Sequence, residues 1–112
     1  MYTKLDHDQA VTHWATDLLA TATDVVTRKM FGCPAFFVGR RMFACVYEDE
    51  VGLKLPATQV QTLIAGGVAE SFQPYGKPKM RQWCALLGRN LMHPTSAELL
   101  LCALSWARSG HI

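Results

Sequence analysis

The hydrophobic and polar positions near the start of the chain repeat with the period of an amphipathic helix. The apolar residues that recur at three- and four-residue steps are Val11, Trp14, Ala15, Leu18, Leu19 and Ala22. We therefore expect a helix over residues 6–22 that buries one side. Asp6 and Gln9 have the spacing of a capping box with aspartate as the cap, which places the predicted start at Asp6.

After this helix the pattern changes to short apolar runs separated by turn residues, which is typical of strands. The expected strands cover residues 25–30, 35–38, 42–47 and 51–55. The expected breaks are residues 31–34, Gly39-Arg40 and residues 48–50. In the fourth run Gly52 and Lys54 alternate with apolar residues, which predicts one buried and one solvent-exposed face. Together these runs predict an antiparallel meander.

A second, shorter helix is expected to begin at Pro56 and to end at Gly66-Gly67, because proline suits a first helical turn and glycine suits a helix end. The segment 71–80 holds two prolines, a glycine and two lysines, so it predicts a loop. A short strand around Phe72 fits the same segment.

Residues 82–87 predict a further strand, and a third helix is expected after His93-Pro94. Thr95 and Glu98 have the spacing of a second capping box, and Gly110 ends this helix. The predicted order is helix, strands, helix, strand, helix. Grouped strands favour an α+β fold, with the helices packed on one face of an antiparallel sheet.

Composition narrows the class of protein. The chain has 112 residues, which indicates a single domain over 1–112. Half of the residues are hydrophobic and 18% are charged, which excludes a disordered chain. No apolar run approaches the roughly 20 residues of a membrane span, and no secretory signal precedes the first helix. We expect a cytoplasmic protein without a membrane partner.

The cysteines suggest no metal site and no disulfide framework. They are Cys33, Cys45, Cys84 and Cys102, and their spacings match no zinc pattern. In a reducing compartment structural disulfides are not expected. Cys45, Cys84 and Cys102 lie in apolar stretches and predict buried side chains. Cys33 lies in the predicted turn, so we expect it to be the most exposed, and a reactive thiol there would need a lowered pKa.

No catalytic constellation is visible. The histidines are scattered, and no pair of acids has a spacing that points to general acid–base chemistry. The phosphate-binding glycine motifs and the G-x-S-x-G motif are missing from the sequence. We therefore expect no catalytic residues, no metal and no cofactor.

The strongest local signal is basic and aromatic. Residues 1–24 carry one lysine and four aspartates, whereas the rest of the chain is basic and the net charge is +2. A set of cations lies beside aromatic residues, and we call it the basic set: Arg28, Lys29, Arg40, Arg41, Lys77, Lys79 and Arg81. Such residues bind phosphates and stack on bases, which indicates a nucleic-acid surface. Equally, basic residues keep loops soluble and protect sheet edges.

The same stretches carry a family resemblance. The run R-K-M-F-G at residues 28–32, the hairpin around Met42-Phe43-Ala44 and the L-K-L-P at 53–56 resemble the N-terminal domain of the TfoX/Sxy competence regulators. The segment around Phe72, the G-K-P at 76–78 and the closing helix are similar to the same family. The resemblance covers about residues 10–108, and it implies the same α+β fold.

Membership would imply a bacterial, non-enzymatic regulatory module that acts through protein contacts and is linked to transcription of competence genes. Cys33 stands where the family usually has a glycine, and the full-length regulators carry a second, C-terminal domain that we expect this chain to lack. The first hypothesis is therefore a stand-alone interaction domain that forms a homodimer and binds an unidentified protein partner. The alternative is direct binding of nucleic acid through the basic set.

Overall fold

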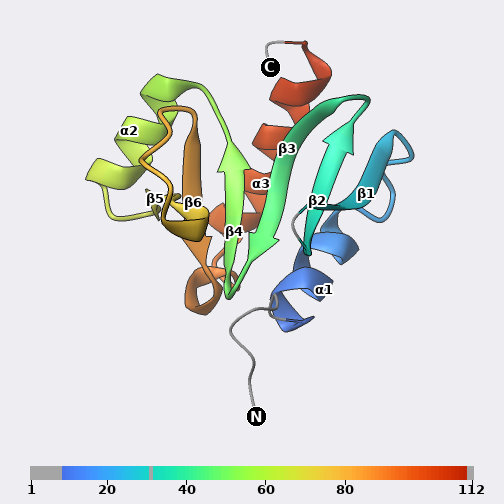
Figure 1. Ribbon diagram of the computed structural model, residues 1–112, viewed down its shortest axis with the longest axis horizontal. Coiled ribbons are helices and arrows are strands. Elements are labelled where there is room, and N and C mark those ends of the chain that lie inside the picture. Colours follow the sequence, from blue (N-terminus) through green and yellow to red (C-terminus); the bar gives the residue numbers. More distant parts are fainter. Residues whose placement is uncertain (1–8, 31, 111–112) are drawn as a thin grey trace.

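The computed structural model describes residues 9–30 and 32–110 (Figure 1). The helices are α1 (Gln9–Leu18), α2 (Ala57–Ala65) and α3 (Pro94–Arg108), with short 3-10 turns η1 (Pro74–Gly76) and η2 (Gly88–Asn90). The strands are β1 (Val25–Met30), β2 (Cys33–Val38), β3 (Arg41–Tyr47), β4 (Glu50–Lys54), β5 (Glu70–Ser71) and β6 (Trp83–Leu87). No helix among the described residues combines the length and the apolar character that a membrane crossing requires.

The six strands form one antiparallel sheet in the order β1-β2-β3-β4-β6-β5. The first four strands are neighbours in both sequence and space, so the predicted meander is confirmed. β6 then pairs with β4, and the two-residue β5 pairs with β6 as the far edge. The opposite edge is β1, whose bounds match the prediction.

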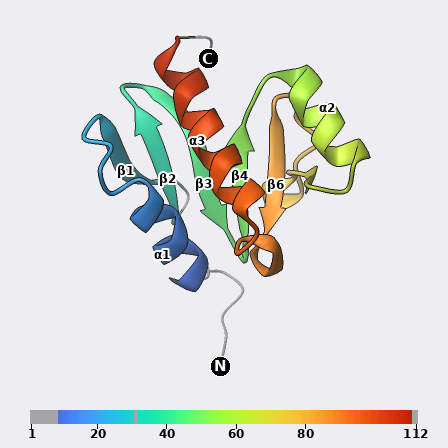
Figure 2. The same cartoon turned by 180° about the vertical axis from the view of Figure 1, so that it is seen from behind.

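All three helices lie on the same side of the sheet, which we call the helix face (Figure 2). α3 crosses its centre over β3 and β4, α1 lies at the β1–β2 side, and α2 lies beside β5 and β6. Their apolar sides meet alternate strand residues in one core. Its largest fully buried members include Phe36, Phe43, Leu53, Leu86 and Leu100. The predicted α+β architecture with helices on one face is therefore confirmed.

The other side of the sheet, here called the pocket face, is covered by a loop. Residues 72–80 cross it between β5 and β6 (Figure 1). Gly52 lies directly beneath this loop, since a Cβ built there would lie 2.7 Å from the Phe72 ring. The prediction that β4 has a solvent-exposed face is wrong at Gly52, because the Phe72 ring covers it.

A β-bulge in β3 changes which residues face the pocket side. Phe36 pairs with Ala44, but its neighbour Phe37 pairs with Met42, so Phe43 is an extra residue in β3. Both Phe43 and Ala44 are buried in the core. Met42 and Cys45, three positions apart, consequently share the pocket face, which strict alternation would forbid.

The first helix and the cap of the third differ from the predictions. α1 ends at Leu18, earlier than expected, and turns follow it; the predicted cap at Asp6 lies outside the described residues. The cap of α3 is His93, whose Nδ1 accepts a hydrogen bond from the Thr95 backbone N–H at 3.2 Å. The predicted Thr95 capping box is wrong, because Pro94 occupies the first helical position and Thr95 is already inside the helix.

The predicted break at residues 31–34 is shorter than expected. Residue 31 lies outside the described residues, and β2 already begins at Cys33. Cys33 is only 5% exposed, so the prediction that it is the most exposed cysteine is wrong. Cys84 is buried as predicted, but Cys102 lies on the outer side of α3 and is exposed, because a helix carries only part of its circumference to the core.

Candidate functional site

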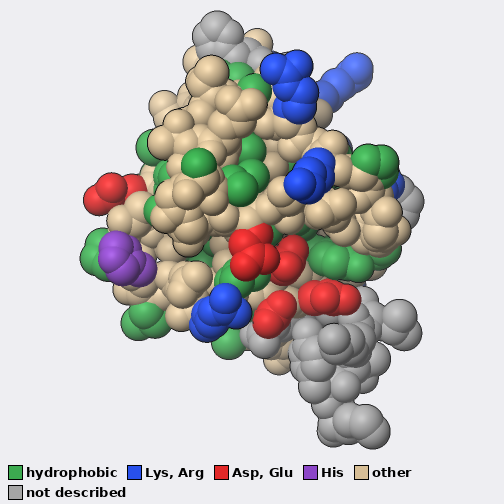
Figure 3. Space-filling model, turned by 90° about the vertical axis from the view of Figure 1, so that its left-hand side faces the viewer, with side chains coloured by type: hydrophobic (Ala, Val, Ile, Leu, Met, Phe, Trp, Pro, Cys, Tyr) green, Lys and Arg blue, Asp and Glu red, His purple; other side chains and the backbone are tan. Residues whose placement is uncertain are grey.

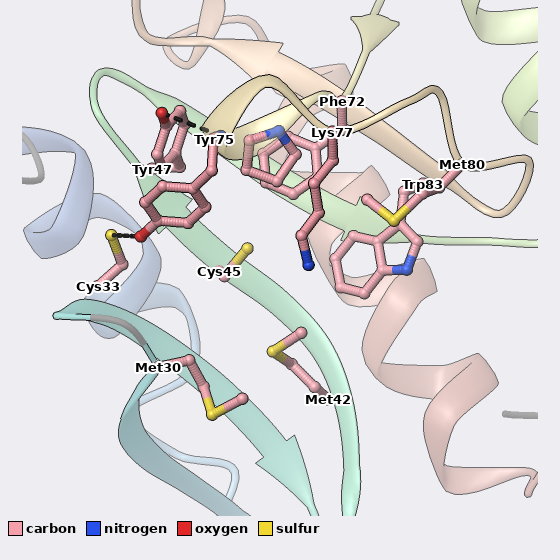
Figure 4. A pocket seen from close by; sticks show the side chains of 11 residues that line it. Met30, Cys33, Met42, Cys45, Tyr47, Phe72, Tyr75, Lys77, Met80 and Trp83 are labelled. Atoms are coloured by element: carbon pink, nitrogen blue, oxygen red, sulfur yellow. Dashed lines mark hydrogen bonds between the residues drawn. The ribbon is translucent and has the colours of Figure 1, made fainter.

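A cavity of about 160 Å³ lies between the pocket face and the loop, and we call it the aromatic–sulfur pocket (Figure 4). Aromatic rings, methionine sulfurs and thiols make up most of its lining. The lining residues are Met30, Cys33, Met42, Cys45, Tyr47, Phe72, Pro74, Tyr75, Lys77, Met80 and Trp83. They come from β1, β2, β3, β6 and the loop, so four strands and one irregular segment build the site together.

The aromatic rings form a continuous wall. The Phe72 and Trp83 rings lie 5.7 Å apart between centroids at an angle of 31°. Tyr47 packs edge-on against Phe72 at 6.4 Å and against Tyr75 at 4.7 Å. Such offset and edge-to-face contacts are the favourable geometries for aromatic pairs. The wall therefore ties the loop to β3 and β6.

Hydrogen bonds fix the loop at Tyr75. Its backbone N–H donates to the Tyr47 hydroxyl at 3.1 Å, and its own hydroxyl lies 3.2 Å from the Cys33 sulfur. Tyr75 has a positive φ of 57°, which turns the chain sharply at this point. The pKa of Tyr75 is raised to about 12, mainly by the hydrogen bond with Cys33 and to a smaller extent by burial. The phenol is therefore neutral at physiological pH.

The thiol at the base of the pocket is also neutral. Burial raises the pKa of Cys45 to about 12, with a smaller contribution from Cys33. A thiol with such a pKa is a poor nucleophile and a poor metal ligand at neutral pH. Among the described residues no group of three or more His, Cys, Asp or Glu side chains is placed to hold a metal ion.

The carboxyl of Glu50, near this site, has an unusually high pKa. Burial, together with the charges of Asp49, Glu48 and Glu70, raises the pKa of Glu50 to about 7. Figure 3 shows acidic side chains gathered on one side of the molecule. Glu50 pairs with Tyr47 across β3 and β4, so this acidic cluster adjoins the tyrosine end of the pocket.

The second feature is the free edge of the sheet at β1. Within residues 9–30 and 32–110 only β2 pairs with this strand, and all residues of β1 after Val25 are exposed. Val26 is 45% exposed and Met30 is 40% exposed, although both are apolar. Arg28 lies over the Phe37 ring with its guanidinium carbon 5.3 Å from the ring centroid. β1 thus offers an unpaired backbone with basic and apolar side chains.

The structure distributes the basic set over several regions. Strand alternation sends Arg28 and Lys29 to opposite faces of the sheet. Arg41 donates from Nε to the Ala107 carbonyl at 2.8 Å, at the C-terminal end of α3, where a cation is favourable. Lys77 lines the pocket. The remaining members are exposed: Arg40 in the β2–β3 turn, Lys79 in the loop and Arg81 just after it.

The pocket itself was not predicted. Its methionines and aromatic residues appear in the sequence as ordinary core residues, and the loop that closes it has no periodic pattern. One signal could have indicated it: Gly52, in the middle of an apolar strand, is typical of a position that another group approaches closely.

Comparisons with known proteins give one match. The family model described as TfoX N-terminal domain matches residues 17–101 of the 112. The match takes in the strands, α2, the loop and the first half of α3. The searches of curated proteins and of solved structures found no match.

Proposed function

Since the chain belongs to the TfoX N-terminal domain family, a family of regulatory domains, we propose that it is a non-enzymatic regulatory module that binds an extended, acidic segment of another protein along β1. The observation that carries this proposal is the free, six-residue edge of the sheet. An extended peptide adds to such an edge by main-chain hydrogen bonds, and its side chains then give specificity.

Charge favours an acidic partner segment over a second copy of β1. Arg28 and Lys29 are both exposed on this strand. Two antiparallel copies of β1 would place two cations on each face of the joined edge, and like charges across a strand pair are destabilising. Glutamate or aspartate on the added strand would instead face these cations. Apolar residues between them would cover Val26 and Met30.

Because the chain resembles competence regulators, we infer that the contact at β1 regulates the transcription of DNA-uptake genes. Regulation by strand addition needs no chemically reactive side chain. This agrees with the raised pKa values of Cys45 and Tyr75, which keep both groups protonated and unreactive. The partner segment would then belong to a protein that controls that transcription.

The test is affinity capture from a bacterial lysate with the wild-type protein and two charge-reversed variants. Lys29→Glu alters the β1 edge, whereas Lys79→Glu alters the exposed loop and serves as the matched control. We expect a partner that is retained by Lys79→Glu and lost with Lys29→Glu. A wild-type protein that enriches no partner, or a partner that both variants retain equally, would overturn the proposal. Light scattering on the purified protein decides separately whether it forms a homodimer.

Binding of nucleic acid remains the second candidate, and the exposed cations Arg28, Lys29 and Arg40 favour it. Exposed arginine and lysine side chains bind the phosphates of nucleic acid by charge. Fluorescence anisotropy with single-stranded and duplex DNA at two salt concentrations tests it. Affinity that falls steeply with salt and weakens in Arg40→Glu would support this candidate. No binding at low salt would exclude it.

A further inference from the structure

The aromatic–sulfur pocket has the size and lining of a small-molecule site. Its volume of about 160 Å³ is close to that of engineered protein cavities of about 150 Å³ that bind benzene. We propose that it binds a small aromatic carboxylate, with the ring against the Phe72–Trp83 wall and the carboxylate at Lys77. The proposal does not depend on the protein contact at β1.

The chemistry of the walls selects an aromatic ring. Phe72 and Trp83 lie in a tilted, near-offset arrangement on one side of the pocket, and Tyr47 presents its edge to Phe72. Methionine sulfurs from Met42 and Met80 complete the lining, and thioethers make favourable contacts with ring edges. Such surroundings are more favourable for a flat, polarisable ring than for a sugar or a peptide.

The charge of the lining selects an anion. Of the side chains that line the pocket in the described part of the chain, Lys77 is the one that carries a full charge. Figure 4 shows it extending toward the space between Cys45 and Trp83. Cys45 and Tyr75 stay protonated, so no negative group opposes a bound carboxylate from within the pocket.

The acidic cluster sets the orientation of the ligand. Glu50 and its neighbours lie beside Tyr47, at the tyrosine end of the pocket. A carboxylate placed there would be repelled, whereas one placed at Lys77 is attracted. The ring must therefore enter with its carboxylate directed away from Tyr47.

The pocket is built rather than accidental. The loop is held over the sheet by the Tyr75–Tyr47 and Tyr75–Cys33 hydrogen bonds. Gly52 leaves the space that the far end of the buried Phe72 ring occupies on β4. The pocket wall is consequently formed before any ligand arrives, which lowers the entropy lost on binding.

The experiment is a titration of the ¹⁵N-labelled protein with sodium benzoate, followed by the indole N–H signal of Trp83. Benzyl alcohol, which has the same ring without the charge, is titrated in parallel. We expect benzoate to shift the Trp83 signal in a saturable way and to bind about tenfold more tightly than benzyl alcohol, the usual size of a charge-assisted contact.

Three variants isolate the role of Lys77. We expect Lys77→Met to weaken benzoate binding about tenfold and to leave benzyl alcohol unchanged, while Lys77→Arg restores most of the affinity. Lys79→Met, in the same loop but outside the lining, is the matched control and should bind benzoate as the wild type does.

Two results would overturn the proposal. The first is a Trp83 signal that does not move with benzoate up to about 20 mM, beyond which any site would be too weak to matter. The second is equal binding of benzoate by the wild type and Lys77→Met, because the pocket would then recognise the ring without the carboxylate. Neither result bears on β1, so the proposed function would stand or fall separately.

Discussion

The two faces of the sheet differ in almost every physical respect. The helix face carries large apolar side chains such as Phe43, Leu53 and Leu86, which are fully buried under helices. The pocket face carries aromatic rings, thiols, thioethers and a half-buried carboxyl, and an irregular loop covers it. Alternation along the strands keeps the two sets apart. One face can therefore determine the fold while the other is free to carry binding.

The largest expected effect is on the helix face. Leu100→Ala removes a fully buried side chain of α3 and leaves a cavity, so we expect a loss of about 2–5 kcal/mol in the free energy of unfolding. The neighbouring Leu101 is 45% exposed, and Leu101→Ala should change that free energy by less than about 0.5 kcal/mol. Urea denaturation measures both; similar losses would contradict the assignment of the core to one face.

The next effect concerns the contact between loop and sheet. A Cβ at position 52 would lie 2.7 Å from the Phe72 ring, so Gly52→Ala forces that buried ring to move. We expect a loss of about 1–3 kcal/mol in the free energy of unfolding, the usual range for overpacking. The same substitution in a Phe72→Ala background should cost much less. Equal losses in the two backgrounds would show that the ring is not responsible.

A smaller effect should appear as a dependence of stability on pH. The pKa of Glu50 rises from 4.5 to about 7 on folding, so the folded protein holds a proton that the unfolded chain has released. Stability contributed by this group is complete below pH 4.5 and is lost as the pH rises through about 7. Because the Glu50 side chain is only half-buried, solvent screens its interactions. We therefore expect the free energy of unfolding to fall by about 1 kcal/mol between pH 4.5 and pH 7.

Thermal unfolding at a series of pH values measures that effect. The variant Glu50→Gln keeps the shape of the side chain and removes its titration. We expect its stability to vary less between pH 4.5 and 7 than that of the wild type. Identical pH profiles would assign the dependence to other groups.

The smallest effect is expected inside the pocket. Met42 is half-buried and borders a cavity, so Met42→Ala removes only part of a buried side chain. We expect a loss of at most about 1 kcal/mol in the free energy of unfolding, well below that of Leu100→Ala. A loss as large as that of Leu100→Ala would mean that both faces contribute equally to stability.

Local patterns in the sequence predicted most of the fold. β1 has the predicted bounds, because a β-branched start and a following glycine turn are both visible locally. The apolar stripe of α1 predicted which side of this helix packs into the core. The errors lie where a neighbour decides the outcome: Cys33 joins β2 through pairing with Met30, and His93 rather than Thr95 caps α3.

The candidate sites were predictable only in part. Charge beside aromatic residues indicated the basic residues of β1, and the structure shows that this strand is exposed after Val25. The pocket depends on the path of residues 72–80 across the sheet and on the bulge at Phe43, neither of which has a periodic signature. The placement of the basic set on separate surfaces likewise follows from strand alternation and from the Arg41 contact with α3.

The bulge at Phe43 also determines where β3 tolerates a change in length. Removing a residue outside the Phe43–Ala44 bulge from the middle of the strand would exchange the two faces on one side of the deletion. Removing Phe43 would instead place Met42 directly beside Ala44, with both still opposite their present partners in β2. Relatives one residue shorter at this position could therefore keep every other side chain of β3 on its present face, and would lose only the core phenylalanine.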